Sequence, residues 1–258
     1  MGPRIGVVLF PGSNCEFDAL EAMGAVGADA EVLWHQDPTT AGVDAVIVPG
    51  GFAHGDALRP GAIARFSPVM EAVAAFAADG GPVVGICNGF QVLTEAGMLP
   101  GALQKNRGLK FVCTMVELRV DSTASPLTSG AQVGDVLRVP VNHFEGNYTC
   151  SAACLDELRG EDRVVLRYRD NPNGSTDDIA GITNQARNVV GLMPHPERAM
   201  STLLGSDDGL VLLRSLVDAA RANTAGPSPN AAGASANEAG ASAGAAGDGA
   251  GPVSSRSG

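Results

Sequence analysis

The sequence predicts an α/β fold in which a mostly parallel sheet carries helices on both of its faces. Short apolar runs rich in Val and Ile alternate with stretches of helical spacing over residues 4–96. Strands that are joined through helices imply right-handed crossovers and parallel pairing. The length of 258 residues and a hydrophobic content of 45% are enough to build a sizeable core.

Near-continuous apolar character marks the strands of the first part, and apolar spacing marks its helices. RIGVVLF is a strand of this kind, and Phe17, Leu20 and Met23 then share one helical face. Ser67 and Pro68 form a helix start, and the glycines at 80 and 81 end that helix. In order, the predicted elements are strand 4–10, helix 14–26, strands 30–35 and 44–50, helix 67–78, strand 82–86 and helix 88–96.

From residue 108 onward the pattern changes to strand after strand, separated by turn residues such as DNPNGS. The predicted strands are 109–120, 136–143, 164–170, 178–184 and 189–195, and a closing helix follows over 207–222. These elements form one domain, residues 1–222. Residues 223–258 are nearly all Ala, Gly, Ser, Pro and Asn, which predicts a disordered tail because little apolar surface can be buried there.

Charge, hydropathy and cysteine content argue against several classes of protein. Seventeen basic against 28 acidic residues give a net charge of −11, which argues against a nucleic-acid partner. The N-terminal apolar run is too short for a membrane span and lacks the features of a signal peptide, so a cytoplasmic enzyme is expected. Five widely spread cysteines fit reduced thiols, and Cys150 and Cys154 have no second ligand pair nearby, so no metal site is predicted.

The stretch PVVGICNGF places Cys87 between two glycines where a strand must turn. The spacing of Gly85, Cys87 and Gly89 is typical of a sharp strand-to-helix turn that lifts a nucleophile above a sheet. A helix start beside the sulfur would also favour the thiolate. The alternative is a small buried core cysteine, because most isolated cysteines pack in that way.

A cysteine nucleophile needs a base, and the chain has only four histidines, His35, His54, His143 and His195. His195 is the best candidate, because flanking prolines restrict its backbone after an apolar strand and Glu197 supplies a carboxylate two residues on. The alternative is a rigid surface turn with a solvated ion pair between Glu197 and Arg198.

Two further features bear on this chemistry. The glycines of VPGGFAHGD could let backbone N–H groups bind an anion, although a tight turn would need them equally. Cys15 also follows a strand, but it lacks the flanking glycines and has Glu16 and Asp18 beside it, so Cys87 is preferred as the nucleophile.

Taken together, GICNGFQ, the PGGF loop and PHPE resemble the class I, triad-type glutamine amidotransferases, which have a flavodoxin-like sheet. With NHFEGNY, YRDNPNGSTDDIAGITN and GLMPHPERAM, the set resembles the glutaminase subunits of phosphoribosylformylglycinamidine synthase over residues 4–220. Departures from that pattern are Phe144, His54 and Ala57, which affect loop shape and partner contact more than the triad.

The resemblance implies that Cys87 is the nucleophile, His195 the general base and acid, and Glu197 the orienting carboxylate. It implies an oxyanion hole of backbone N–H groups, and it implies contacts to glutamine from one side chain and one loop. The residues for these roles are Gly51, Phe52 and Asn88 for the oxyanion, and Gln91, Asn142, His143 and Phe144 for substrate.

The sequence has no G-x-x-x-x-G-K-[ST] phosphate loop, and Lys105 and Lys110 are its only lysines. If the chain is such an amidotransferase, ATP must therefore act on another subunit. By resemblance, no cofactor binds this subunit, and a large synthetase subunit supplies the ATP and Mg²⁺ chemistry, with a small accessory subunit. That complex would convert formylglycinamide ribonucleotide in purine biosynthesis. The alternatives are another Cys-dependent hydrolase or redox-responsive protein on a similar fold, and a non-catalytic interaction module.

Overall fold

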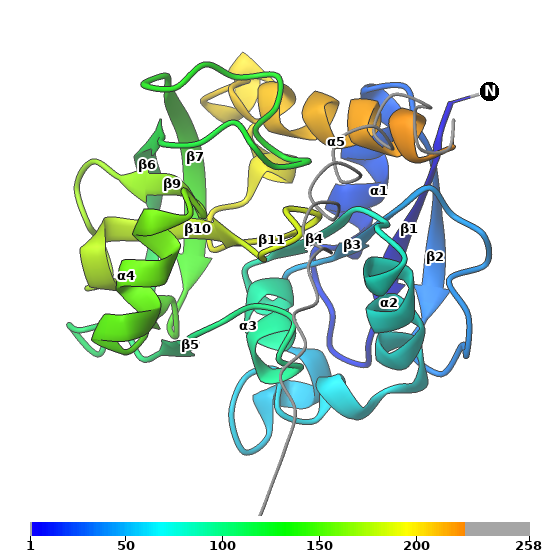
Figure 1. Ribbon diagram of the computed structural model, residues 1–258, viewed down its shortest axis with the longest axis horizontal. Coiled ribbons are helices and arrows are strands. Elements are labelled where there is room, and N and C mark those ends of the chain that lie inside the picture. Colours follow the sequence, from blue (N-terminus) through cyan, green and yellow to red (C-terminus); the bar gives the residue numbers. More distant parts are fainter. Residues whose placement is uncertain (1, 225–258) are drawn as a thin grey trace, which may run out of the picture. The chain divides into compact units, whose positions relative to one another are not determined.

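A nine-stranded sheet runs through residues 2–224, the part of the chain that the computed structural model describes (Figure 1). In spatial order, its strands are β2 (Asp29–Trp34), β1 (Arg4–Leu9), β3 (Ala45–Val48), β4 (Val83–Ile86), β11 (Val189–Leu192), β10 (Ile179–Thr183), β9 (Val164–Tyr168), β6 (Val112–Val120) and β7 (Val136–His143). β5 (Ala102–Gln104) and β8 (Asn147–Thr149) pair as a separate small sheet.

The two halves of the large sheet differ in strand direction. β2, β1, β3, β4 and β11 pair in parallel, whereas β10, β9, β6 and β7 extend the sheet by antiparallel pairs. The central parallel strands are buried along their length, as the continuous apolar runs predict. β10 and β11 are joined by residues 184–188 alone, and a connection this short can join only antiparallel neighbours.

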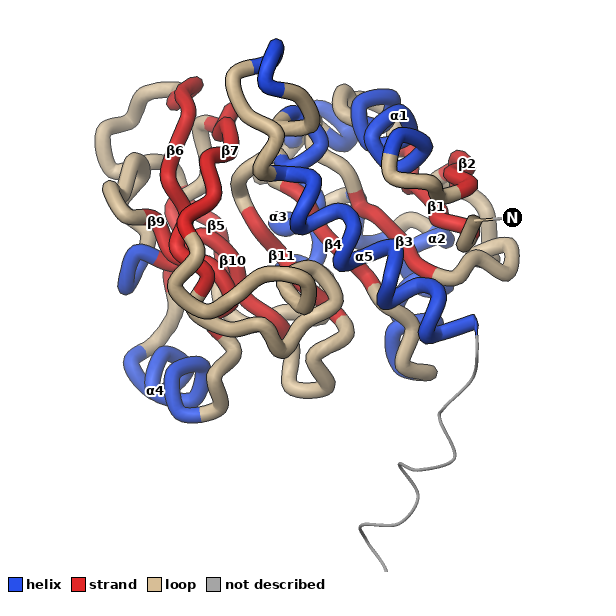
Figure 2. Tube along the Cα trace, turned by 90° about the horizontal axis from the view of Figure 1, so that it is seen from above, coloured by secondary structure: helices blue, strands red, loops and turns tan. Residues whose placement is uncertain are grey.

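Helices cover both faces of the parallel half (Figures 1 and 2), which confirms the predicted fold class. On one face lie α1 (Glu16–Ala25) and α5 (Gly209–Thr224), and on the other lie α2 (Pro68–Ala78) and α3 (Asn88–Glu95). Residues 223 and 224 therefore end α5, and the rest of the predicted tail lies outside the described residues. Within residues 2–224, no helix is both long enough and apolar enough to cross a bilayer.

Three elements had no counterpart in the sequence prediction. Helix α4 (Ala152–Gly160) begins after Ser151, whose side chain accepts a hydrogen bond from the Cys154 N–H, so the capping residue was a usable signal. The strands β5 and β8 are only three residues long, and strands of that length leave little periodicity to detect.

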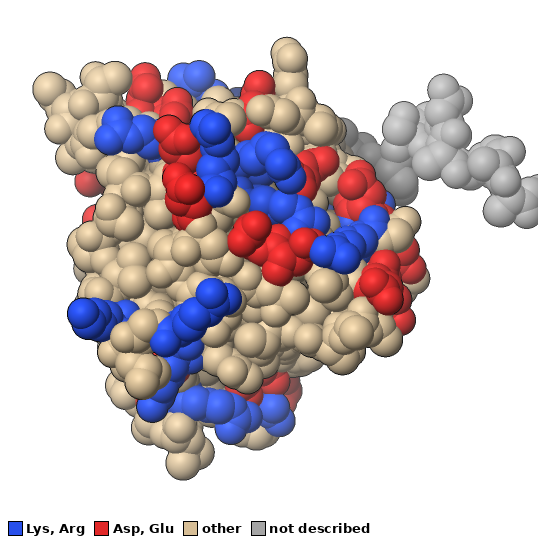
Figure 3. Space-filling model, turned by 90° about the vertical axis from the view of Figure 1, so that its left-hand side faces the viewer, with Lys and Arg blue, Asp and Glu red and all other residues tan. Residues whose placement is uncertain are grey.

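On the face shown in Figure 3, acidic and basic side chains are mixed over the upper part, and the lower part carries mainly basic side chains. Several of the arginines are held by carboxylates, including the pairs Arg119 with Asp121 and Arg169 with Glu117.

Candidate active site

Cys87 lies at the turn between β4 and α3, with a backbone conformation that side chains rarely adopt. Its φ is 52° and its ψ is −103°, and it is the residue that precedes the first turn of α3. Its N–H donates to the Leu192 carbonyl of β11 at 2.8 Å, which ties the turn to the sheet. A non-glycine residue at such a φ costs of the order of 1–3 kcal/mol, and strain of this kind is concentrated at functional sites.

The flanking glycines are needed because the strand and the helix approach each other closely. A Cβ placed on Gly89 would come 1.8 Å from the Val48 carbonyl oxygen of β3. A Cβ on Gly85 would come 2.7 Å from the Gly89 carbonyl carbon and oxygen. The geometry expected from the GICNG spacing is therefore present, and a larger residue at either glycine would push α3 away from the sheet.

His195 follows β11 and is paired with Glu197. Its Nδ1 lies 2.6 Å from Oε1 of Glu197, and both side chains are 1% exposed. The backbone N–H of His195 donates to the Pro140 carbonyl at 2.8 Å, so the backbone is fixed as well as the ring. Nε2 of His195 is buried and has no hydrogen-bond partner, which leaves this nitrogen available for proton transfer.

The surroundings of His195 favour its protonated form. Burial of the ring opposes protonation, but the Glu197 carboxylate and the thiols of Cys87 and Cys15 together hold the pKa of His195 above its ordinary value. An imidazolium next to a cysteine favours the thiolate, because opposite charges stabilise each other where water is excluded.

Arg198 does not pair with Glu197, so the solvated ion pair considered as an alternative is not formed. Its Nε donates to Oδ2 of Asp18 at 2.9 Å, and its Nη2 donates to Sγ of Cys15 at 3.1 Å. Asp18 and Cys15 thereby hold the guanidinium at α1, and the Glu197 carboxylate stays with the imidazole ring.

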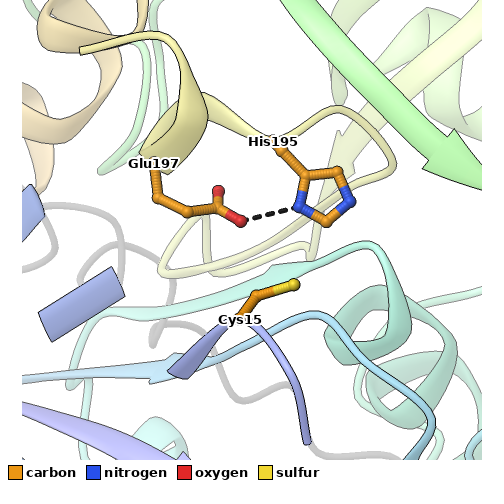
Figure 4. A group of neighbouring side chains, drawn as sticks. All are labelled: Cys15, His195 and Glu197. Carbon is orange, nitrogen blue, oxygen red and sulfur yellow. Dashed lines mark hydrogen bonds and ion pairs between the residues drawn. The ribbon is translucent and has the colours of Figure 1, made fainter. Parts of the chain in front are cut away.

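Cys15 is a second thiol beside the histidine, as Figure 4 shows. Ligand atoms of Cys15, His195 and Glu197 all lie within 4.8 Å of one another, the only such group in the described part of the chain that has the spacing of a metal site. Unlike Cys87, Cys15 has an ordinary backbone, with φ −108° and ψ 9°. The rival nucleophile thus lies in the same site, and backbone geometry favours Cys87.

The loop after β3 contains Gly51 and Phe52, two of the three residues expected to donate to an oxyanion. Gly51 has φ 141°, and a Cβ there would come 2.6 Å from the Asn14 backbone nitrogen, so only glycine fits. The N–H of Phe52 donates to the Gly12 carbonyl at 2.9 Å and is therefore engaged. Gly51 and Asn88 are the better candidates for donors to an oxyanion.

A pocket of about 370 Å³ joins most of the predicted site residues. Asn88 and Glu197 do not line the pocket themselves. They form hydrogen bonds to two residues that do, Gln91 and His195 respectively. His54 lies away from it and packs against Phe10 and His35. The predicted residues that line the pocket are Gly51, Phe52, Cys87, Gln91, Asn142, His143, Phe144 and His195.

His143 lies on the pocket wall in its neutral form. Burial, assisted by the neighbouring His195, lowers the pKa of His143 to about 4. Its Nδ1 lies 3.1 Å from Oδ1 of Asn106, which fixes the orientation of the ring. His143 therefore shapes the loop and carries no positive charge at neutral pH.

Sequence reasoning missed two carboxylates of the pocket, Asp56 and Glu145. Each belongs to a motif that was recognised, since Asp56 ends GGFAHGD and Glu145 follows Phe144. The available signal was an acidic side chain in each of two loops expected to meet at the active-site rim.

Residues 2–207 match the CobB/CobQ-like glutamine amidotransferase domain family. The chain is similar to phosphoribosylformylglycinamidine synthase subunit PurQ of Rubrobacter xylanophilus, with 58% identity over 218 residues that cover 84% of this chain and 99% of the relative. The subunit of the same name from Mycobacterium tuberculosis is 57% identical over 220 residues, which cover 85% of this chain and 98% of the relative.

Solved structures resemble the chain over the same part. A chain in the structure of PurLQS from Thermotoga maritima has a TM-score of 0.79 and 40% identity, with 84% of this chain and 99% of that chain covered. A putative GMP synthase subunit from Thermoplasma acidophilum has a TM-score of 0.60 at 16% identity, over 87% of this chain and 97% of that one, and it shares the fold.

Proposed function

The chain belongs to the CobB/CobQ-like glutamine amidotransferase family, and from that membership we propose that Cys87, His195 and Glu197 hydrolyse glutamine to glutamate and ammonia. The observation that carries the assignment is the strained Cys87 turn, which opens into the same pocket as the buried His195–Glu197 pair. The similarity to PurQ subunits supports glutamine as the substrate.

In the first half of the reaction, the Cys87 thiolate attacks the carbonyl carbon of the glutamine side-chain amide. The oxygen becomes an oxyanion and accepts hydrogen bonds from the backbone N–H groups of Gly51 and Asn88. His195 carries the thiol proton on Nε2 and gives it to the leaving nitrogen, so that ammonia departs and a γ-glutamyl thioester remains.

In the second half, water attacks the thioester carbonyl while Nε2 of His195 accepts a proton from it. The carbon–sulfur bond then breaks, and glutamate leaves as the Cys87 thiolate is restored. Glu197 keeps Nδ1 protonated throughout and stabilises the imidazolium through the 2.6 Å contact.

The ammonia is used by a large synthetase subunit that converts formylglycinamide ribonucleotide to formylglycinamidine ribonucleotide in purine biosynthesis. ATP and Mg²⁺ act in that subunit, and a small accessory subunit completes the complex. The similarity to a chain in PurLQS supports this assembly. A cytoplasmic location fits the five cysteines, which are all free thiols.

The test is glutamine-dependent conversion of formylglycinamide ribonucleotide with ATP, measured with this chain, the large subunit and the accessory subunit. We expect product only when this chain and glutamine are both present, with one glutamate released per product. Conversion that proceeds equally from glutamine without this chain would refute the assignment.

A further inference from the structure

Two carboxylates in the pocket have no part in the chemistry described above. Asp56 ends the short 3₁₀ helix after β3 (Ala53–Asp56), and Glu145 lies between β7 and β8. Both line the pocket that contains Cys87 and His195. They come from loops far apart in the sequence, so the fold itself brings them to one cavity.

A chain of hydrogen bonds connects the two loops to the start of α3. Nδ2 of Asn88 donates to Oδ1 of Asp56 at 3.2 Å and to Oε1 of Gln91 at 2.8 Å. Nε2 of Gln91 then donates to the backbone carbonyl of Glu145 at 2.6 Å. Because these bonds begin at the residue after Cys87, the Asp56 carboxylate and the Glu145 loop have fixed positions relative to the nucleophile.

The two carboxylates repel each other when both are ionised. Burial and the charge of Glu145 raise the pKa of Asp56 to about 6, although the hydrogen bond from Asn88 acts in the opposite direction. Arg59 lines the same pocket, but Glu95 holds its guanidinium through two contacts of 2.6 Å. Within residues 2–224, neither Asp56 nor Glu145 takes part in an ion pair.

A cationic group on the ligand would relieve this repulsion, and glutamine carries one. The reacting end of the pocket is marked by Nε2 of His195, which is buried and without a partner. Gln91 lies four residues beyond Cys87 on α3, about 6 Å along the helix axis, a distance comparable to the length of a glutamine side chain. With the amide at Cys87, a glutamine that extends along α3 would place its α-ammonium group near Gln91, whose Nε2 donates to the Glu145 carbonyl.

We propose that Asp56 and Glu145 bind the α-ammonium group of glutamine and so make the site selective for an α-amino acid over a simple amide. The inference rests on the proposed glutaminase function and extends it to substrate selection. Hydrogen bonds between charged groups are stronger than neutral ones, and loss of one such bond is expected to reduce affinity about 10- to 100-fold.

Binding of the ammonium group by Asp56 would also make KM for glutamine depend on pH. Glu145 is the charged group that acts on Asp56, and the cationic side chains that line the same pocket are Arg59, Lys105, His195 and Arg198. An ammonium ligand stabilises the ionised carboxylate, so it binds best when Asp56 is deprotonated. KM for glutamine should therefore rise as the pH falls below about 6, the pKa of Asp56 in the free enzyme.

The experiment compares L-glutamine with 4-carbamoylbutanoate, the same molecule without its α-amino group, in the reconstituted complex. Asp56→Asn and Glu145→Gln are the test variants, and Asp156→Asn on the exposed side of α4 is the matched control. We expect each test variant to lose about 10- to 100-fold in kcat/KM for glutamine, mainly through KM. Activity on 4-carbamoylbutanoate should stay within about 3-fold of the parent, which also shows that the site is folded.

The outcomes separate this inference from the proposed function. If the parent releases no glutamate from glutamine, the proposed function fails. If the parent is active but the variants keep its full preference for glutamine, the binding role of these carboxylates is wrong. Equal losses on both substrates would also overturn it, because the carboxylates would then act on the pocket and not on the ammonium group.

Discussion

Replacement of Glu197 by Gln is the most informative single change in the site, because it removes one charge and keeps the size of the side chain. In the parent, Nδ1 of His195 and Oε1 of Glu197 are 2.6 Å apart and buried. At an effective dielectric constant of about 20, unit charges at that separation attract each other by about 6 kcal/mol.

The glutamine amide can still accept a hydrogen bond from Nδ1, so part of this energy is retained. A net loss of about 3–5 kcal/mol in stabilisation of the imidazolium corresponds to a decrease of about 10²- to 10⁴-fold in kcat. Because Glu197 raises the pKa of His195, its loss should also move the alkaline limb of the kcat profile to lower pH.

The assay is steady-state release of glutamate by the complex across the neutral and alkaline range, with Glu71→Gln on the exposed part of α2 as the control. KM should change little, since Glu197 stands behind the wall of the pocket. A Glu197→Gln protein as active as the parent would refute the triad. That result would favour the alternative in which a different Cys-dependent reaction uses Cys87 without this carboxylate.

Two further predictions concern the turn and the second thiol. Gly89→Ala should destabilise the protein by about 2–4 kcal/mol and abolish activity, because the added Cβ would lie 1.8 Å from the Val48 carbonyl oxygen. Thermal unfolding measures this loss, and the control is Gly24→Ala, whose added Cβ would have no atom within 4 Å. Cys15→Ser should keep glutaminase activity within about 10-fold of the parent, since a serine hydroxyl can still accept a hydrogen bond from Arg198. A glutamine-analogue electrophile should still label Cys87 in this variant. Complete inactivation with loss of labelling would instead identify Cys15 as the nucleophile.

Local features of the sequence were sufficient to predict the turn and the histidine pair. The glycines around Cys87 and the prolines around His195 restrict the backbone within a few residues, so their effect is visible in a short stretch. The parallel strands were predicted for the same reason, because burial on both faces leaves a continuous apolar run.

Features that depend on distant contacts were not accessible in this way. Cys15 was treated as a competitor of Cys87, whereas the structure places it beside His195, because α1 and the end of β11 meet only once the sheet is assembled. The Asp56–Asn88–Gln91–Glu145 connection spans three segments of the chain. No sequence pattern reports hydrogen bonds between separate loops.

The central claim is that Cys87 releases ammonia for a reaction on another subunit. The direct measurement compares glutamine with ammonium salt as the nitrogen source for the reconstituted complex that contains Cys87→Ala. We expect glutamine-dependent conversion of formylglycinamide ribonucleotide to disappear while ammonia-dependent conversion stays near that of the parent. Glutamine-dependent conversion that persists at the parent rate in Cys87→Ala would contradict the account.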